Sequence, residues 1–253
     1  IVLGAGIDAF ESLVEARDAP GLARSLQSRD AVRAFRVSLE VAALDGWGGF
    51  APAAATNTAS LRLSRGIESL GASDGDAGTT ARRGSDFGFS KIVAEATRLQ
   101  PLASFGDGWM LAVQGTIAGQ WSDDVLPPAE KFFLGGNRLG RGFYAGQIPG
   151  DRALGFPAEV QLGRLAELAL PHGAPLRLGT QFYLFRDGGE ARDNGPFGTE
   201  RRLASWGGGV RLQFDERVQL AVEGVRRLTR NPEGVGVAEL SEKAVFARLL
   251  LRF

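Results

Sequence analysis

The sequence predicts an all-β protein that forms part of a membrane β-barrel, with about ten antiparallel strands. Three observations support this fold class. Apolar and polar residues alternate with a period of two, long and short connections alternate between the predicted strands, and no apolar run approaches the roughly 18 residues that a spanning helix needs. The mean hydropathy of -0.05 fits strands that face lipid on one side and water on the other.

The clearest alternation lies at the C-terminus, where every second residue is apolar. This apolar set is Val245, Ala247, Leu249, Leu251 and Phe253. A terminal aromatic after such a pattern is similar to the last-strand signal of bacterial outer-membrane proteins, and we interpret Phe253 in this way. The alternative is an ordinary terminal aromatic on a strand of a β-sandwich.

The same period predicts nine further strands. They cover residues 1–10, 31–43, 58–67, 86–98, 108–121, 156–167, 176–187, 203–214 and 217–228. Long connections are expected at 11–30, 68–85, 122–155, 188–202 and 229–242, and short ones at 100–107, 168–175 and 215–216, with 44–57 longer than this alternation requires. Outer-membrane barrels carry long loops at one end and tight turns at the other, so the pattern favours a barrel over a sandwich.

Composition excludes several classes of function. The 29 lysine and arginine residues are balanced by 29 aspartate and glutamate residues, which argues against a nucleic-acid partner. The sequence contains no cysteine, which excludes disulfides and thiolate metal sites. The single histidine, His172, lies in a predicted turn without a catalytic partner at suitable spacing. We therefore expect no enzymatic activity, no cofactor and no metal. The N-terminus lacks a signal peptide, and we expect the chain to begin within a strand of a larger protein.

The connection at 122–155 holds the most specific motif. It contains an arginine between two glycines and then a Gly-Asp-Arg stretch: Gly140, Arg141, Gly142, Phe143, Gly150, Asp151 and Arg152. The flanking glycines permit tight backbone conformations, so they allow Arg141 to reach deep into a narrow lumen.

A charge inside a lumen needs a fixed partner. Asp187 lies on the polar face of its predicted strand and can accept two parallel hydrogen bonds from Arg141. We predict a loop-to-wall pair of Arg141 and Asp187, with Glu159 and Tyr183 as candidates for the same network. The alternative is that Arg141 is solvated and that Asp187 begins an Asp-Gly turn.

These motifs together resemble the outer-membrane polypeptide-transport superfamily. Upstream segments are similar to its two-partner secretion branch, the hemolysin secretion/activation family. The resemblance is carried by 130–162, Phe185-Arg186-Asp187-Gly188-Gly189, 203–212, Leu63-Ser64-Arg65-Gly66 and Arg98-Leu99-Gln100-Pro101. The chain departs from the family at Gly140, where valine is usual, and at Ala153, where glycine is usual.

The resemblance implies a barrel of about sixteen strands that follows periplasmic POTRA domains. Residues 1–253 would supply its C-terminal part, without the POTRA domains and the first strands. The 122–155 connection would fold back into the lumen with Arg141 at its tip. The implied function is an outer-membrane pore that exports a large hemolysin- or adhesin-type exoprotein. Its partners would be that exoprotein, outer-membrane lipid and the barrel assembly machinery.

The sequence leaves two alternatives open. One is an insertase of the same superfamily, which assembles other outer-membrane proteins. The other is a soluble β-sandwich or lectin-like binding module, which would stay in solution without detergent.

Overall fold

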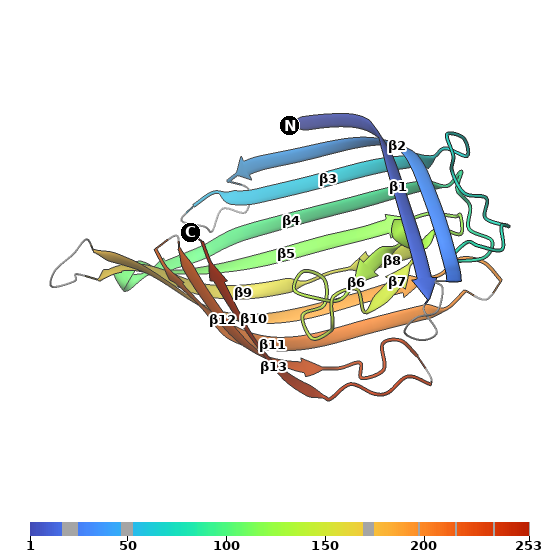
Figure 1. Ribbon diagram of the computed structural model, residues 1–253. Helices are drawn as coiled ribbons and strands as arrows, with labels where there is room; N and C mark the ends of the chain where they lie inside the picture. The colour runs from blue at the N-terminus through green and yellow to red at the C-terminus, as the bar shows by residue number, and fades with distance from the viewer. Residues whose placement is uncertain are drawn as a thin grey trace.

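A computed structural model describes residues 1–16, 25–46, 53–168, 175–196, 198–215, 217–234 and 236–252. One curved antiparallel sheet dominates it (Figure 1). Its strands are β1 (Val2–Ala16), β2 (Ser25–Asp45), β3 (Ala55–Gly66), β4 (Ser90–Phe105), β5 (Trp109–Trp121), β8 (Arg152–Gly155), β9 (Ala158–Leu168), β10 (Leu176–Arg192), β11 (Glu200–Phe214), β12 (Val218–Arg227) and β13 (Lys243–Leu251).

The strands pair in chain order, and β8 and β9 share one place. Both lie between β5 and β10, so they are two parts of a single spanning strand that is interrupted at residues 156–157. Two short 3-10 helices, η1 (Gly106–Gly108) and η2 (Pro128–Glu130), lie in connections. The all-β prediction, with about ten antiparallel strands, is confirmed.

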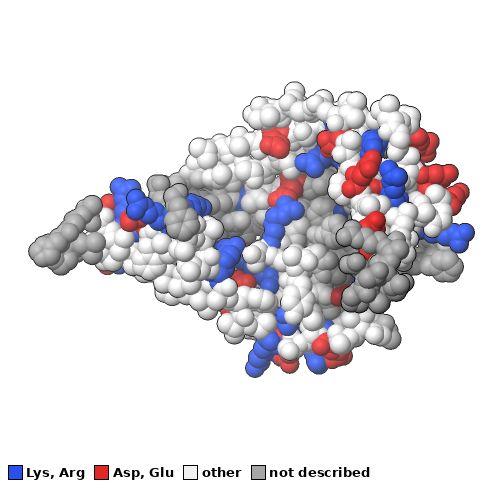
Figure 2. Space-filling view, viewed as in Figure 1, with Lys and Arg blue, Asp and Glu red and all other residues white. Residues whose placement is uncertain are grey.

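The register divides the sheet into two chemically different faces, because residues opposite one another on neighbouring strands point to the same side. In β10, Phe182 and Leu184 lie on the outer face and are 50% and 67% exposed. Tyr183 and Asp187 point to the inner face. Figure 2 shows charged side chains gathered in the hollow of the sheet and at its loop end, while the flanks are mostly uncharged. This alternation is the one that the sequence predicts.

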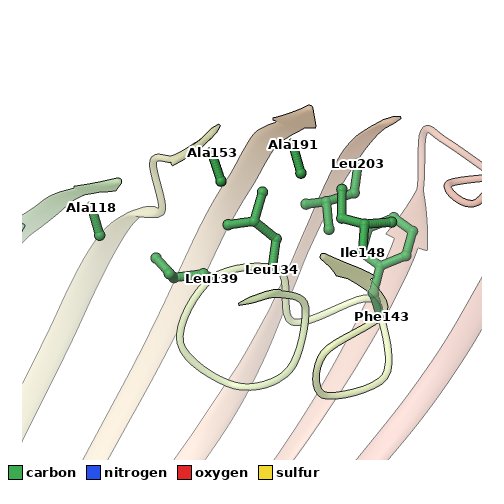
Figure 3. Close-up of a cluster of buried hydrophobic side chains, with 8 residues drawn as sticks. All are labelled: Ala118, Leu134, Leu139, Phe143, Ile148, Ala153, Ala191 and Leu203. Atoms are coloured by element: carbon green, nitrogen blue, oxygen red, sulfur yellow. The ribbon is translucent and has the colours of Figure 1, made fainter. Parts of the chain in front are cut away.

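The 122–155 segment folds onto the inner face of the sheet. Its strands β6 (Phe132–Leu134) and β7 (Ile148–Gly150) form a small hairpin of their own. Apolar residues of the segment pack against small residues of the wall (Figure 3). This cluster consists of Ala118, Leu134, Leu139, Phe143, Ile148, Ala153, Ala191 and Leu203. Small wall residues leave room for the segment, so the core of the molecule lies between loop and wall.

Several predicted connections are shorter in the structure than the sequence suggests, among them 11–30 and 188–202. In the expected connection 11–30, β1 continues to Ala16 and β2 begins at Ser25. In 188–202, β10 continues to Arg192 and β11 begins at Glu200. The outer parts of these extensions contain charged residues that form cross-strand ion pairs, such as that between Arg192 and Glu200. A search for apolar alternation does not detect strands of this kind.

One predicted strand begins later than expected. Residues 86–89 precede β4, and Phe87 and Phe89 pack in a buried cluster with Val32 and Leu126. Phe253 and His172 lie outside the described residues. Within the described part of the chain, no helix combines the length and apolar character needed to cross a bilayer.

A pair of adjacent substitutions tests the assignment of the faces. Leu61 lies on the outer face, opposite Leu39 and Ala94, and Ser60 points inward, opposite Glu95. Arginine on a lipid-facing position of a barrel costs about 2–4 kcal/mol near the bilayer midplane. In the full-length protein we expect Leu61→Arg to lower the folded fraction on unheated electrophoresis gels, and Ser60→Arg to leave it unchanged. Equal folded fractions would contradict the assignment.

Candidate functional site

Arg141 joins the 122–155 segment to the inner wall. Its backbone N–H donates to Oδ2 of Asp187 at 2.7 Å, and its guanidinium donates to the same carboxylate through Nε at 3.2 Å and Nη2 at 3.0 Å. Nη1 of Arg141 donates to Glu159, and the guanidinium carbon lies 3.8 Å from the ring centroid of Phe185. The structure thus brings the three predicted residues Arg141, Asp187 and Glu159 together at one point.

Arg211 of β11 supplies the second positive charge of this site. It donates to Oε1 and Oε2 of Glu159 at 2.6 and 2.9 Å, and its guanidinium lies 3.7 Å from the ring centroid of Tyr183. The Tyr183 hydroxyl donates to Glu223 at 2.8 Å. Arg141 and Arg211 therefore balance the charges of Asp187 and Glu159. We call these four residues the loop anchor.

Burial makes this charge balance necessary. The side chains of Arg141, Asp187 and Glu159 are only 9%, 1% and 7% exposed. Burial works against the charge of Arg141, but its hydrogen bonds to the two carboxylates outweigh burial and raise the pKa of its guanidinium. Removing one partner from a buried pair typically costs about 3–5 kcal/mol, because the other charge stays buried.

Glycines set the path of the chain on both sides of Arg141. Gly140 has a φ of +133°, a conformation that favours glycine, so the departure from the family's usual valine has a backbone cause. Gly142 lies against the wall, where an added Cβ would be 2.9 Å from Cβ of Ser205 and from Cγ1 of Val225. Arg227 holds this stretch too, since its Nε donates to the carbonyl of Gly142.

Glu130 anchors the start of the segment to the opposite side of the wall. It accepts hydrogen bonds from Arg36 of β2 at 2.7 and 3.2 Å, and Nζ of Lys91 lies 2.8 Å from its Oε2. Burial opposes the charge of Glu130, but the hydrogen bonds from Arg36 and the nearby Lys91 outweigh burial and lower the pKa of this carboxyl. A second charged contact therefore holds the segment in place.

Asp151 ties together connections at the end of the sheet. It is fully buried and accepts hydrogen bonds from Arg82 at 2.6 and 2.8 Å. The backbone N–H groups of Leu126 and Asn194 also donate to Asp151, at 3.1 and 2.7 Å. These partners come from three different connections, so the aspartate of the Gly-Asp-Arg stretch joins the loops to one another and not to the Arg141 site.

The remaining motif residues have different surroundings. Phe143 is buried in the cluster of Figure 3, and Gly150 leaves no room for a Cβ, which would lie 2.8 Å from the backbone nitrogen of Arg192. Arg152, expected in the lumen loop, instead begins β8, and its guanidinium stacks 4.2 Å from the ring centroid of Trp121. Arg152 points outward because side chains alternate along a strand and the next residue, Ala153, packs inward.

The predicted C-terminal signal is described only in part. Leu249 and Leu251 lie in β13 and are 60% and 49% exposed, whereas Phe253 is outside the described residues. The exposed leucines face the same side as Leu220 and Val218 of β12. This side belongs to the outer apolar face.

Several residues of the charged contacts were not predicted from the sequence as site residues. They are Arg36, Arg82, Lys91, Glu130 and Arg211. Alternation places Arg211 on the polar face, but nothing in the sequence assigns its partner. Arg82 lies outside the strands, so no period applies to it.

The arrangement positions a loop and does not assemble a reactive group. Among the described residues, no group of three or more His, Cys, Asp or Glu side chains could hold a metal ion. The charged residues of the loop anchor are engaged with one another. The contacts of Arg141 join the loop to the wall, and that of Arg211 with Glu159 joins β11 to β9 across β10. The site can therefore fix, or on opening release, a loop inside the hollow of the sheet.

Comparisons with known proteins agree with this fold. A model of the family described as haemolysin secretion/activation protein ShlB/FhaC/HecB matches residues 26–212. Among solved structures, CdiB from Escherichia coli is similar with a TM-score of 0.66 and 19% sequence identity, over 98% of this chain and 41% of that chain. The chain thus spans less than half the length of CdiB, and the likeness concerns the fold. No curated protein matched the sequence.

Limited proteolysis in the full-length protein tests the loop anchor. Asp187→Asn keeps the size of the side chain but removes the charge that Arg141 requires, so we expect residues 135–147 to be cleaved at least tenfold faster, given a cost of about 3–5 kcal/mol. Arg138→Gln is the control, because Arg138 lies in the same segment and its ion pair with Glu95 is exposed to solvent, which makes that pair worth at most about 1 kcal/mol. Equal cleavage of the wild type and Asp187→Asn would refute the anchor.

Acidification tests the Glu130 contact. A carboxyl whose pKa is lowered by folding stabilises the protein fully above the pKa of a free glutamate, and this contribution is lost as pH falls through the lower folded value. We expect the segment to keep its protection just below the ordinary glutamate range and to lose it at stronger acidity. With an acid-active protease, Glu130→Gln should show a smaller acid-dependent change than the exposed control Glu167→Gln. The same change in both variants would contradict this expectation.

Proposed function

The chain belongs to the haemolysin secretion/activation protein family ShlB/FhaC/HecB, whose members are outer-membrane β-barrel transporters of Gram-negative bacteria, and we propose that it forms part of a pore for two-partner secretion. The exported substrate is a large exoprotein of the hemolysin or adhesin type. In this proposal, residues 1–253 supply the C-terminal strands of the barrel and its lumen loop.

The observation that carries the proposal is a loop held against a polar inner wall by buried charges. Arg141 reaches from the loop to Asp187 and Glu159, on two adjacent strands of that wall. Side-chain amides of the neighbouring strands continue the polar wall. Gln161 donates to Gln114 and Gln181 donates to Gln161, each at 3.1 Å. A polar wall of this kind offers hydrogen-bonding groups to an extended polypeptide, and the loop controls how much of the lumen is open.

Two-partner secretion requires the loop to have a defined position, because a wide barrel without it would leak. The family of the chain and the buried loop anchor both support a role for Arg141 in holding the loop in position. The outer apolar face supports contact with outer-membrane lipid, since barrel strands alternate lipid-facing and lumen-facing residues. Insertion through the barrel assembly machinery is part of the same proposal for the full-length protein.

Charge reversal within the loop anchor tests the function. In the full-length protein we expect Arg141→Glu to abolish secretion, because three carboxylates would then meet in a buried space. Adding Asp187→Arg restores an opposite charge across the contact. The restoration should be partial, since the carboxylate introduced on the loop would still repel Glu159. Secretion of the exoprotein into the medium is the measurement.

The control variant is Arg138→Glu, which reverses a 62% exposed charge in the same segment. Solvent weakens the pair of Arg138 with Glu95, so this variant should secrete at close to the normal level. Each variant is first shown to fold in the outer membrane by its unheated electrophoretic mobility. Normal secretion by a folded Arg141→Glu variant would overturn the role that we assign to the loop anchor.

A further inference from the structure

A row of positive charges crosses the outer face of the sheet near its loop end. The register places Arg186 of β10 opposite Trp206 of β11, Trp206 opposite Arg226 of β12, and Arg226 opposite Lys243 of β13. Because neighbouring strands lie about 4.8 Å apart, these four residues span about 14 Å. All four are exposed, Trp206 to 46%.

These residues share the apolar face and not the polar lumen. On the same face, the next position toward the tight turns holds Leu184, Gly208, Gly224 and Val245. Leu184 and Val245 are 67% and 77% exposed, as expected of side chains that contact lipid. Tryptophan is enriched where such a face meets the headgroups, and long cationic side chains extend toward that level. The row therefore lies at a membrane interface.

The row carries an excess of positive charge. Arg226 pairs with Glu242 at 2.7 Å. Among the described residues, neither Arg186 nor Lys243 is engaged in an ion pair. Three cations and one carboxylate leave a net charge of about two, which is exposed to headgroups and attracts anionic lipids.

A notch lies directly beneath the row. Gly208 and Gly224 are neighbours across β11 and β12. The side chain of Leu184 covers Gly208, where an added Cβ would lie 2.7 Å from Cδ2 of Leu184, so the notch is confined to Gly224, between Leu184 and Val245. A Cβ added to Gly224 would meet nothing within 4 Å, so the space in front of this glycine is open. An acyl chain whose headgroup is bound by the row can lie in this notch.

We propose that the cation row, Arg186, Trp206, Arg226 and Lys243, together with the notch at Gly224, binds a phosphorylated, multiply acylated glycolipid of the outer leaflet. The position favours this lipid class over phospholipids of the inner leaflet, because the row lies toward the end of the sheet that carries the long 122–155 connection, the extracellular end of an outer-membrane barrel. The phosphates contact the cations, and the sugar packs on Trp206.

The test uses the full-length protein in detergent micelles and bisphosphorylated lipid A as the probe, with the bound lipid measured by native mass spectrometry. We expect Arg186→Gln/Lys243→Gln to weaken binding about 25-fold, at about fivefold per cation. The matched control is Arg65→Gln/Arg177→Gln, which removes the same charge from exposed arginines elsewhere and should stay within about twofold of the wild type.

Two further arms separate headgroup from acyl-chain recognition. Dephosphorylated lipid A should bind the wild type as weakly as lipid A binds the double variant. Gly224→Phe, which fills open space and leaves every charge in place, should weaken binding of lipid A in protein shown to be folded by its unheated mobility. Equal binding of lipid A by the wild type and Arg186→Gln/Lys243→Gln, or equal binding of the dephosphorylated lipid, would overturn the proposal.

Discussion

A guanidinium buried between a loop and a wall must be neutralised by carboxylates in direct contact with it, and this requirement organises the structure. Arg141 meets Asp187 and Glu159, and Arg211 balances the second carboxylate. Asp187 accepts a hydrogen bond from the backbone N–H of Arg141 as well as from its side chain. The contact therefore fixes the position of the loop backbone and not only that of the guanidinium. The loop is thereby tied to β9 and β10, and indirectly to β11.

The same constraint explains why small residues surround the contact. A loop can bring a charge to the wall only if the backbone approaches closely, and Gly142 against Ser205 leaves no room for a side chain. Apolar packing completes the attachment, with Leu134 and Ile148 fully buried beside Ala118 and Ala191 of the wall. Charge decides where the loop attaches, while this apolar contact excludes the water that would otherwise weaken the ion pairs.

The fold was predictable from the sequence because one face of each strand meets lipid and the other meets water, which leaves a period of two in residues such as Phe182, Tyr183 and Leu184. The pairing of Arg141 with Asp187 was predictable from the motif and the polar face. The contacts of Glu130 with Arg36 and Lys91 were not, because they join segments far apart in the chain without a shared period. The outward position of Arg152 depends on where β8 begins, which its sequence does not mark.

Hydrogen exchange at the Arg141 backbone amide, measured on the full-length protein in a lipid bilayer, tests the attachment of the loop to the wall most directly. This amide donates to Asp187 at 2.7 Å inside a buried contact, so we expect slow exchange comparable with that of strand amides in β10. Exchange as fast as that of an exposed loop amide, in protein whose strands remain protected, would show that the loop is not held to the wall by this residue.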